Sequence, residues 1–321
     1  MKKTLGLLAA AVMMLSLFAA CASGDSGSAD NSASNSGGGN FGSADNSTPN
    51  SGGDASANDA GSVPVSAFDA SRVIGVHTRE DGSGTRDAFV SITGVGDDMY
   101  GEAVVLGSTN EILSQVGASE YAIGYISVGS LNDTVKALSI DGVVPSNTTV
   151  KDGSYAIQRP FLVCITEEKL ADPLVDDFIS FMLSAQGQAQ LGSSWTTIND
   201  APSDYSPAGL TGALRIGGST SVDPLMQKMR EAYLALNDGV TIDISGAGSG
   251  DGINGASAGE YDIGMSSREL REAELETLTP ISIALDGVAV IVNTANPLLN
   301  LSIGQVKEIF TGEITRWSGV N

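Results

Sequence analysis

The sequence predicts an α/β fold, as one large domain or two lobes, for the chain from about residue 67 onward. Short runs rich in Val and Ile alternate with segments whose apolar residues recur at the helical period. Loops made largely of Gly, Ser, Asp and Thr separate these runs. The stretch is long enough to bury a sizeable core.

The expected elements follow from local pattern. Strand candidates are Val73–His77, Ala122–Ile126, Ala156–Ile165, Leu214–Gly217, Val240–Ile244, Asp262–Met265 and Val288–Val292. The best helix is Val222–Leu236, because its apolar residues fall on one face and Pro224 suits a first turn. Further helices are expected at Asn110–Val116, Pro173–Leu183, Arg268–Leu275 and Ile303–Phe310. Residues 199–212 are rich in Pro, Ser, Asp and Gly and are expected to be a linker.

Residues 1–20 have the layout of a secretory signal peptide. Lys2 and Lys3 precede an apolar run that is shorter than the ~20 residues a transmembrane helix needs. The junction before Cys21 resembles the lipobox of bacterial lipoproteins, although Phe18 stands where Leu or Val is usual. The resemblance implies lipidation of Cys21 and a place at the extracytoplasmic face of the cell membrane. The alternative is an ordinary signal peptide with an incidental Cys.

Residues 21–66 are expected to form a flexible tether behind the lipidated Cys21. After the Cys the segment consists almost entirely of Ser, Gly, Asn, Asp and Ala, with five Asp and no Lys or Arg. Such a composition cannot bury enough surface to offset the entropy of ordering. The whole chain carries a net charge of −22. An acidic protein of this kind argues against nucleic acid as a partner, but backbone N–H groups can still hold an anion locally.

Four loops share a design suited to an oxyanion: each follows a strand, is built of small or hydroxylated residues, and is expected to lead into a helix. They are Gly217–Ser221, Gly246–Gly252, Ser266–Arg268 and Asp81–Arg86. The first turn of a helix presents unpaired N–H groups and a partial positive charge, and small residues let an anion approach the backbone. The alternative for each single loop is an ordinary helix cap or tight turn.

Several other chemistries are disfavoured by the residues present. The Gly-x-Gly repeat at Gly246 does not have the spacing of a dinucleotide fingerprint, and no Walker Lys follows a Gly-rich loop. The single His, His77, lies inside an expected strand and makes a Ser–His–Asp triad implausible. Cys164 sits in an apolar run and is expected to be a buried, inert thiol. No metal site and no cofactor are expected.

Taken together, the loops resemble those of the phosphate-binding component of bacterial phosphate ABC transporters. The similar blocks are RIGGSTSVDPLM, SGAGSGDGI, DIGMSSREL, DGVAVIVNTANPLLNLSIGQVKEIFTGEITRW, TREDGSGTRDAF, YAIGYIS and RPFLVCITEEKL with FISFMLSAQGQ. They span nearly all of residues 73–321. In the family the GSTSV block comes first, whereas here it follows the SAQGQ block and the 199–212 linker. The order resembles a circular permutation, and the alternative is a fragment of a longer tandem protein.

The resemblance implies a two-lobed, periplasmic-binding-protein-like fold of type II, circularly permuted, whose lobes are joined by two crossover strands and close on the ligand. Carried over, residues 67–140 and 293–321 form lobe A. Residues 141–292 form lobe B, including the permutation linker 199–212. The crossovers are expected near Tyr155–Ile165 and Val288–Asn293.

The resemblance also implies the ligand contacts. They are Thr220, Ser221, Ser249, Ser267, Arg79, Ser83, Gly84 and Thr85, with Ser219, Gly250 and Arg268 as adjacent candidates. Arg79 is implied to be the ionic partner of the anion, with Asp81 orienting its guanidinium. Some relatives have an Asp at the position of Ser267, where it accepts the proton of bound phosphate.

The family resemblance implies a monomeric, non-enzymatic receptor that captures inorganic phosphate and delivers it to the permease of an ABC transporter. The missing Asp leaves other oxyanions open, such as sulfate or molybdate, because an acceptor that faces phosphate repels sulfate. A phosphatase and a phosphate-sensing surface protein are the remaining alternatives.

Overall fold

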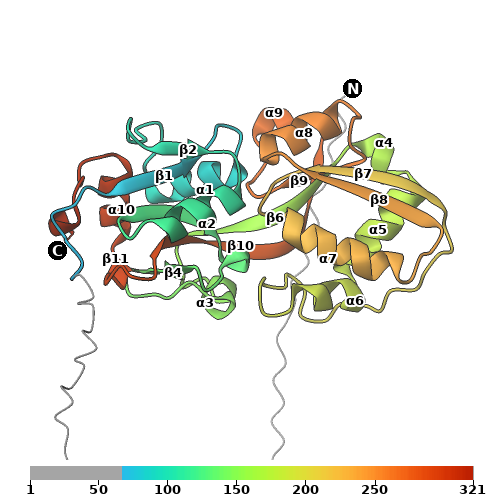
Figure 1. Cartoon of the computed structure of the whole chain (residues 1–321). Helices are drawn as coiled ribbons and strands as arrows, with labels where there is room; N and C mark the ends of the chain where they lie inside the picture. Colours follow the sequence, from blue (N-terminus) through green and yellow to red (C-terminus); the bar gives the residue numbers. More distant parts are fainter. Residues whose placement is uncertain (1–66, 321) are drawn as a thin grey trace, which may run out of the picture. The chain divides into compact units, whose positions relative to one another are not determined.

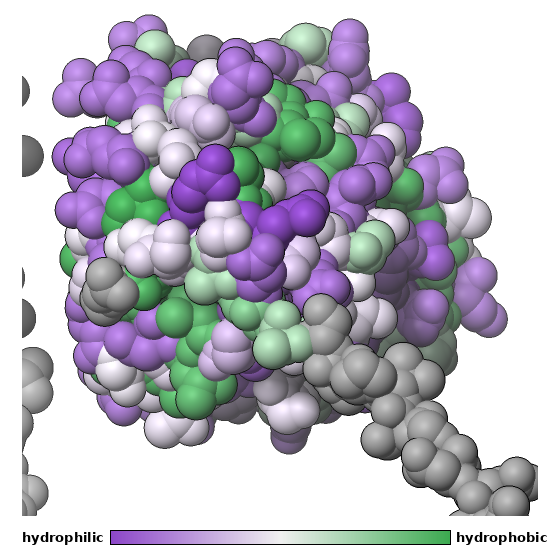
Figure 2. Space-filling view, turned by 60° about the vertical axis from the view of Figure 1, so that its left-hand side comes forward, coloured by the Kyte–Doolittle hydropathy of each residue, from purple (hydrophilic) through white to green (hydrophobic). Residues whose placement is uncertain are grey.

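The computed structural model describes residues 67–320, which belong to one compact unit. The expected signal peptide (1–20), the lipidation site Cys21 and the tether (21–66) lie outside the described residues and stay predictions. Within residues 67–320, no helix combines the length and the apolar character needed to cross a membrane. Hydrophilic residues cover most of the face in Figure 2, with apolar residues in separate patches between them.

The body is built on a nine-stranded mixed sheet with helices packed around it (Figure 1). Its strands follow the order β2-β1-β3-β10-β6-β9-β7-β8, and β4 pairs with the end of β10. The bounds are β1 Gly75–Arg79, β2 Val104–Leu106, β3 Ala122–Ser127, β4 Val135–Ala137, β6 Gln158–Ile165, β7 Gly212–Gly218, β8 Val240–Gly246, β9 Ile263–Ser266 and β10 Thr279–Asn293. A small separate pair joins β5 Ser139–Ile140 to β11 Asn300–Leu301. The α/β prediction is confirmed.

The helices connect these strands. They are α1 Gly84–Thr93, α2 Thr109–Ala118, α3 Asn147–Lys151, α4 Glu167–Leu170, α5 Pro173–Leu183, α6 Ala185–Gln188, α7 Asp223–Leu234, α8 Ser249–Ser257, α9 Glu272–Leu275 and α10 Ile303–Phe310. The expected bounds of α5 and α10 match those found. The expected helix over Arg268–Leu275 is too long. Its first residues form an extended loop, in which the Ser266 hydroxyl accepts from the Arg268 N–H and donates to the Arg268 carbonyl.

The two largest of four hydrophobic clusters in the described residues lie in different lobes. In lobe A, Phe89 stacks on Tyr125 with ring centroids 4.0 Å apart, and Phe310 packs edge-on against Phe89. In lobe B, Phe178 and Tyr233 meet edge-to-face at 4.9 Å. The parallel strands β1, β2 and β3 belong to lobe A, and the parallel strands β7, β8 and β9 to lobe B. Each lobe therefore contributes three parallel strands to the sheet, and helices follow the carboxyl ends of these strands.

The expected boundaries between the lobes require correction. Val150, Tyr155 and Ile157 were expected in lobe B but are buried in the core of lobe A, as are alternate residues of β10 from Val288 to Val292. A hydrogen bond holds the two segments together, in which the Tyr155 hydroxyl donates to the Val288 carbonyl at 2.9 Å. Lobe A is therefore taken as residues 67–157 and 287–320, and lobe B as residues 158–286.

Strands β6 and β10 run between the lobes (Figure 1). Within β10, residues 279–287 pair with β6, and residues 288–292 pair with β3 of lobe A. The change of partner falls at Gly287 and Val288. A buried ion pair lies just before this point, where the Asp286 carboxylate accepts from Arg159 of β6 at 3.2 Å. The chain therefore passes from lobe A to lobe B at the start of β6 and returns to lobe A within β10.

The segment 199–212, expected to be a linker, lies on the surface of lobe B without regular structure up to β7. Tyr205 fixes it there. Its hydroxyl donates to Asp177 of α5 at 2.7 Å, and its ring packs edge-on against Phe181 at 5.2 Å. Burial and this hydrogen bond raise the pKa of Tyr205 to about 12, so the hydroxyl stays protonated. The linker is therefore anchored to the lobe.

The two ends of the described chain meet on lobe A (Figure 1). Val73 forms an antiparallel bridge with Arg316, and the Ser318 N–H donates to the Ala70 carbonyl at 2.6 Å. The Trp317 indole donates to the Tyr121 carbonyl at 3.2 Å. The last residues are thus held beside the strand that opens the fold.

Candidate functional site: a hydroxyl-lined site between the lobes

Loops from both lobes converge at the carboxyl ends of the parallel strands. In lobe A, α1 begins at Gly84 just after β1, and α2 begins at Thr109 just after β2. In lobe B, α7 follows β7 and α8 follows β8. Helix N-termini at the carboxyl edge of parallel strands are a common place for anions, since their N–H groups and dipoles favour negative charge.

Hydroxyls from the two lobes meet directly at this point. The Thr85 hydroxyl lies 2.8 Å from that of Ser221 across the lobes. Thr109 lies 3.4 Å from Thr220 and 3.3 Å from Ser221, each measured between hydroxyl oxygens. Except for Thr220 these side chains are buried. The structure therefore brings together residues that lie 111 to 136 positions apart in the sequence.

A second group of hydroxyls lies beside the start of α1. The Ser219 hydroxyl donates to Ser267 at 2.8 Å, and Ser249 lies 3.3 Å from Ser267. A Cβ on Gly84 would come within 2.2 Å of the Ser249 hydroxyl, so only glycine allows α1 to approach this closely. Across the same gap the Gly250 N–H donates to the Gly82 carbonyl at 2.9 Å. We call the seven side chains the hydroxyl cluster: Thr85, Thr109, Ser219, Thr220, Ser221, Ser249 and Ser267.

Arg79 supplies the cationic group at the edge of the hydroxyl cluster. It ends β1 and is 2% exposed, with Nη1 3.5 Å from the Thr109 hydroxyl. Its backbone N–H donates to Tyr125, which lies beneath the site; burial raises the pKa of Tyr125 and keeps that hydroxyl neutral. Glu80 accepts from Nε at 2.9 Å and from Nη2 at 2.8 Å, which fixes the plane of the guanidinium.

Asp81 does not orient Arg79, contrary to the expectation. Its carboxylate is 95% exposed and pairs with Arg86 on the outer side of α1. The adjacent Glu80 takes the orienting position instead, because it follows Arg79 directly at the end of the strand. Ser83 is found at the N-cap of α1, where its hydroxyl accepts from the Arg86 N–H at 3.4 Å.

Arg268 also departs from the expectation, because its guanidinium is engaged by carboxylates and not by the hydroxyl cluster. Glu274 accepts from both terminal nitrogens at 2.7 Å, and Asp87 lies 2.9 Å from Nε. The pKa of Glu274 is lowered, mainly by its hydrogen bond from Arg268. Arg268 is therefore removed from the candidate contacts.

Thr109 and Glu80 are site residues that sequence reasoning missed. The signal for Thr109 was present, because Gly107-Ser108-Thr109 is a short loop of Gly, Ser and Thr between a strand and a helix. It has the same design as the loops Gly217–Ser221, Gly246–Gly252, Ser266–Arg268 and Asp81–Arg86. The sequence gives no signal for Glu80, because the adjacent Asp81 is also a carboxylate close to Arg79 and local pattern does not distinguish the two.

The chemistry of the site is that of neutral donors around one cation. Hydroxyls, helix N-terminal N–H groups and a buried guanidinium suit a small oxyanion. The carboxylate of Glu80 is committed to Arg79, so the proton acceptors that the described structure places in the cluster are hydroxyl oxygens. His77 lies away from them, with Nδ1 2.9 Å from the Gly75 carbonyl. Residues 67–320 contain no group of three or more His, Cys, Asp and Glu that could hold a metal ion.

The fold and the site together define a two-lobed binding protein, and the family model for the PBP superfamily domain matches residues 66–186 and 203–319. A phosphate-binding protein PstS 2 from Streptococcus pneumoniae TIGR4 is 44% identical over 259 residues, or 78% of this chain and 88% of the relative. The chain belongs to the PstS family of phosphate-binding proteins.

The comparison with solved structures agrees. A crystal structure of a phosphate ABC transporter phosphate-binding protein from the same organism has a TM-score of 0.65 at 43% identity, covering 78% of this chain and all of that one. Another relative matches over a shorter stretch. The phosphate-binding protein PstS of Bacillus subtilis is 29% identical over 141 residues, or 43% of this chain and 46% of the relative.

Proposed function

We propose that this protein binds inorganic phosphate between its lobes and delivers it to the permease of a phosphate ABC transporter. The observation that carries the proposal is the hydroxyl cluster beside Arg79, assembled from the N-terminal regions of helices in both lobes. The names of the similar proteins supply the identity of the anion. The role is capture and release, without chemistry on the ligand.

Membership of the PstS family favours phosphate over other oxyanions as the ligand. Hydroxyl groups can also bind phosphate in either of its protonation states. A hydroxyl donates to a bare phosphate oxygen and accepts from a protonated one, whereas a carboxylate can only accept. Ser267 stands in the cluster between Ser219 and Ser249 and has this freedom. The same freedom keeps sulfate or molybdate as the second candidate, because no committed acceptor would repel a fully ionised anion.

Titration calorimetry of the purified protein tests the proposal. Phosphate should bind reversibly, and Arg79→Ala should weaken binding roughly tenfold or more, because a hydrogen bond to a charged group is worth ~1.5–3 kcal/mol. A competition series with sulfate and molybdate identifies the preferred anion. If the folded protein showed neither a heat of binding nor a change in melting temperature with phosphate, the proposal would be wrong.

We further infer that the protein is exported and held at the extracytoplasmic face of the membrane by a lipid on Cys21. The basic start, the apolar run and the low-complexity segment after the Cys support this. Replacing Cys21 with Ala should move the protein from the membrane fraction to the soluble fraction. Retention at the membrane would contradict lipid anchoring.

We also infer that the chain is circularly permuted relative to most of its family. The pneumococcal relative matches continuously over most of its length, whereas the Bacillus relative matches over less than half. That contrast is expected when two chains share all their parts in a different order. The meeting of Val73 and Arg316 supports the same inference, because that is where an unpermuted chain would run on.

A further inference from the structure

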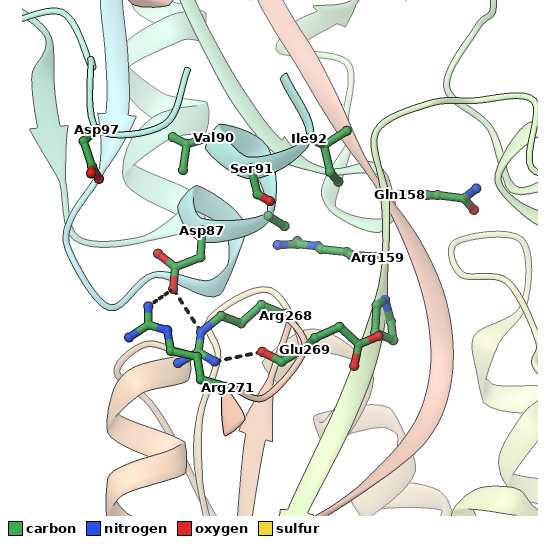
Figure 3. Close-up of a pocket in the computed structure, with 12 residues that line it drawn as sticks. Asp87, Val90, Ser91, Ile92, Asp97, Gln158, Arg159, Arg268, Glu269 and Arg271 are labelled. Carbon is green, nitrogen blue, oxygen red and sulfur yellow. Dashed lines mark hydrogen bonds and ion pairs between the residues drawn. The ribbon is translucent and has the colours of Figure 1, made fainter. Parts of the chain in front are cut away.

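An ion-pair cluster joins the two lobes, with Asp87 facing Arg268 and Arg271 (Figure 3). Asp87 lies on α1 of lobe A. Its Oδ2 is 2.9 Å from Nε of Arg268 and 3.0 Å from Nη2 of Arg271, both in lobe B. The two arginines come from the loop between β9 and α9. One carboxylate of lobe A therefore faces two cations of lobe B.

Lobe B holds the arginines ready for this contact. Glu274 accepts from both terminal nitrogens of Arg268 and from the backbone N–H of Arg271, each at 2.7 Å. The Glu269 carbonyl accepts from Nη1 of Arg268 at 2.8 Å. Arg268 keeps these partners when Asp87 is removed, so loss of Asp87 breaks the tie between lobes without leaving an unpaired buried charge.

The tie acts on the same two segments that form the hydroxyl cluster. Asp87 is in the first turn of α1, which starts with Gly84 and Thr85, and Arg268 directly follows Ser267. The cluster of charges borders a cavity of about 570 Å³ that is also lined by residues of both lobes. The ion pairs therefore lie at the edge of the interface, where they can break without disturbing either hydrophobic core.

We propose that Asp87 is a positioning residue for the anion site. Through Arg268 and Arg271 it holds the start of α1 against Ser249 and Ser267, and so sets how fast a bound oxyanion leaves. The inference rests on the proposed phosphate binding for its ligand readout. Part of the free energy that stabilises the closed lobes then comes from contacts between the lobes that do not involve the ligand.

The first test compares phosphate dissociation rates by stopped flow. Asp87→Asn should speed dissociation about tenfold with little change in the association rate, because the open form still meets phosphate in the same way. Asp87→Glu should restore much of the slow rate. Asp97→Asn is the matched control, since Asp97 lines the same cavity from lobe A and has no ion pair within residues 67–320. Equal dissociation rates for Asp87→Asn and the wild type would overturn the proposal.

A second measurement needs no ligand and separates this inference from the proposed function. The Gly250 N–H donates across the lobes to the Gly82 carbonyl, so its hydrogen exchange reports opening. Asp87→Asn should speed this exchange, and Asp97→Asn should not. If the wild type bound no phosphate but Asp87→Asn still exchanged faster than Asp97→Asn, the proposed phosphate binding would be wrong and the role of Asp87 would stand. If Asp87→Asn failed to fold, Arg271→Gln should show the same effect at smaller size, as Arg271 is exposed; unchanged exchange in Arg271→Gln would then overturn the proposal.

Discussion

At the scale of single residues, the site depends on which carboxylate holds Arg79. Glu80 accepts hydrogen bonds from Nε and Nη2 of the guanidinium, so Nη1 faces Thr109 and the rest of the hydroxyl cluster. Asp81, one residue later, faces solvent with Arg86. Both acids lie in the turn between β1 and α1, where Glu80 reaches back to Arg79 and Asp81 turns outward to Arg86, so the two carboxylates have different partners.

This difference predicts effects of different size on phosphate affinity for two conservative variants. Glu80→Gln should weaken phosphate binding about fivefold, because Arg79 loses one charged acceptor, while the removal of a nearby negative charge offsets part of the loss. Asp81→Asn should stay within about twofold of the wild type. Titration calorimetry of both variants under the same conditions measures the two phosphate affinities. A larger loss for Asp81→Asn would restore the assignment made from the family resemblance.

At the scale of elements, the close approach of α1 to α8 is a requirement of the site. It allows Gly84 to lie against the Ser249 and Ser267 hydroxyls, where a Cβ would be 2.2 Å and 2.8 Å away. No side chain can be accommodated there unless the lobes move apart.

Gly84→Ala should therefore weaken phosphate binding by more than about tenfold while each lobe stays folded, because the collision lies between the lobes. Gly101→Ala is the matched control, since a Cβ there would meet nothing within 4 Å. The measurements are phosphate affinity and the melting temperature without ligand. Gly84→Ala with unchanged affinity would show that the lobes do not need this contact.

The α9 region predicts a pH dependence of stability. The hydrogen bond from Arg268 lowers the pKa of Glu274 below its ordinary value of 4.5. A carboxylate whose pKa is lowered by folding stabilises the protein above the unfolded-state pKa, and this contribution is lost as the pH falls through the folded-state pKa. Between about pH 6 and pH 3, Glu274→Gln should therefore lose less melting temperature than the wild type. Glu272→Gln, at an exposed position of the same helix, should follow the wild type.

At the scale of the whole molecule, the meeting of the chain ends predicts that the order of the halves can be reversed. A chain opened after Ser206, with residue 320 joined to Phe68 by a short flexible link, keeps Tyr205 on lobe B and both strands between the lobes. It should fold and bind phosphate within a few-fold of the original, because a short loop closes at little entropic cost. Circular dichroism and calorimetry check this. A reordered chain that folds but no longer binds would show that the order itself matters for the site.

The sequence by itself determined the α/β class, the bounds of α5 and α10, and most of the residues that meet between the lobes. These were accessible because helical periodicity, caps and small-residue loops are local signals. Only the tertiary structure decided which side chains face the site. It assigned Glu80 in place of Asp81, added Thr109, turned Arg268 toward Asp87 and Glu274, and moved residues 141–157 into lobe A. The physical reason is that side-chain direction and long-range packing depend on partners distant in the sequence, which no local pattern specifies.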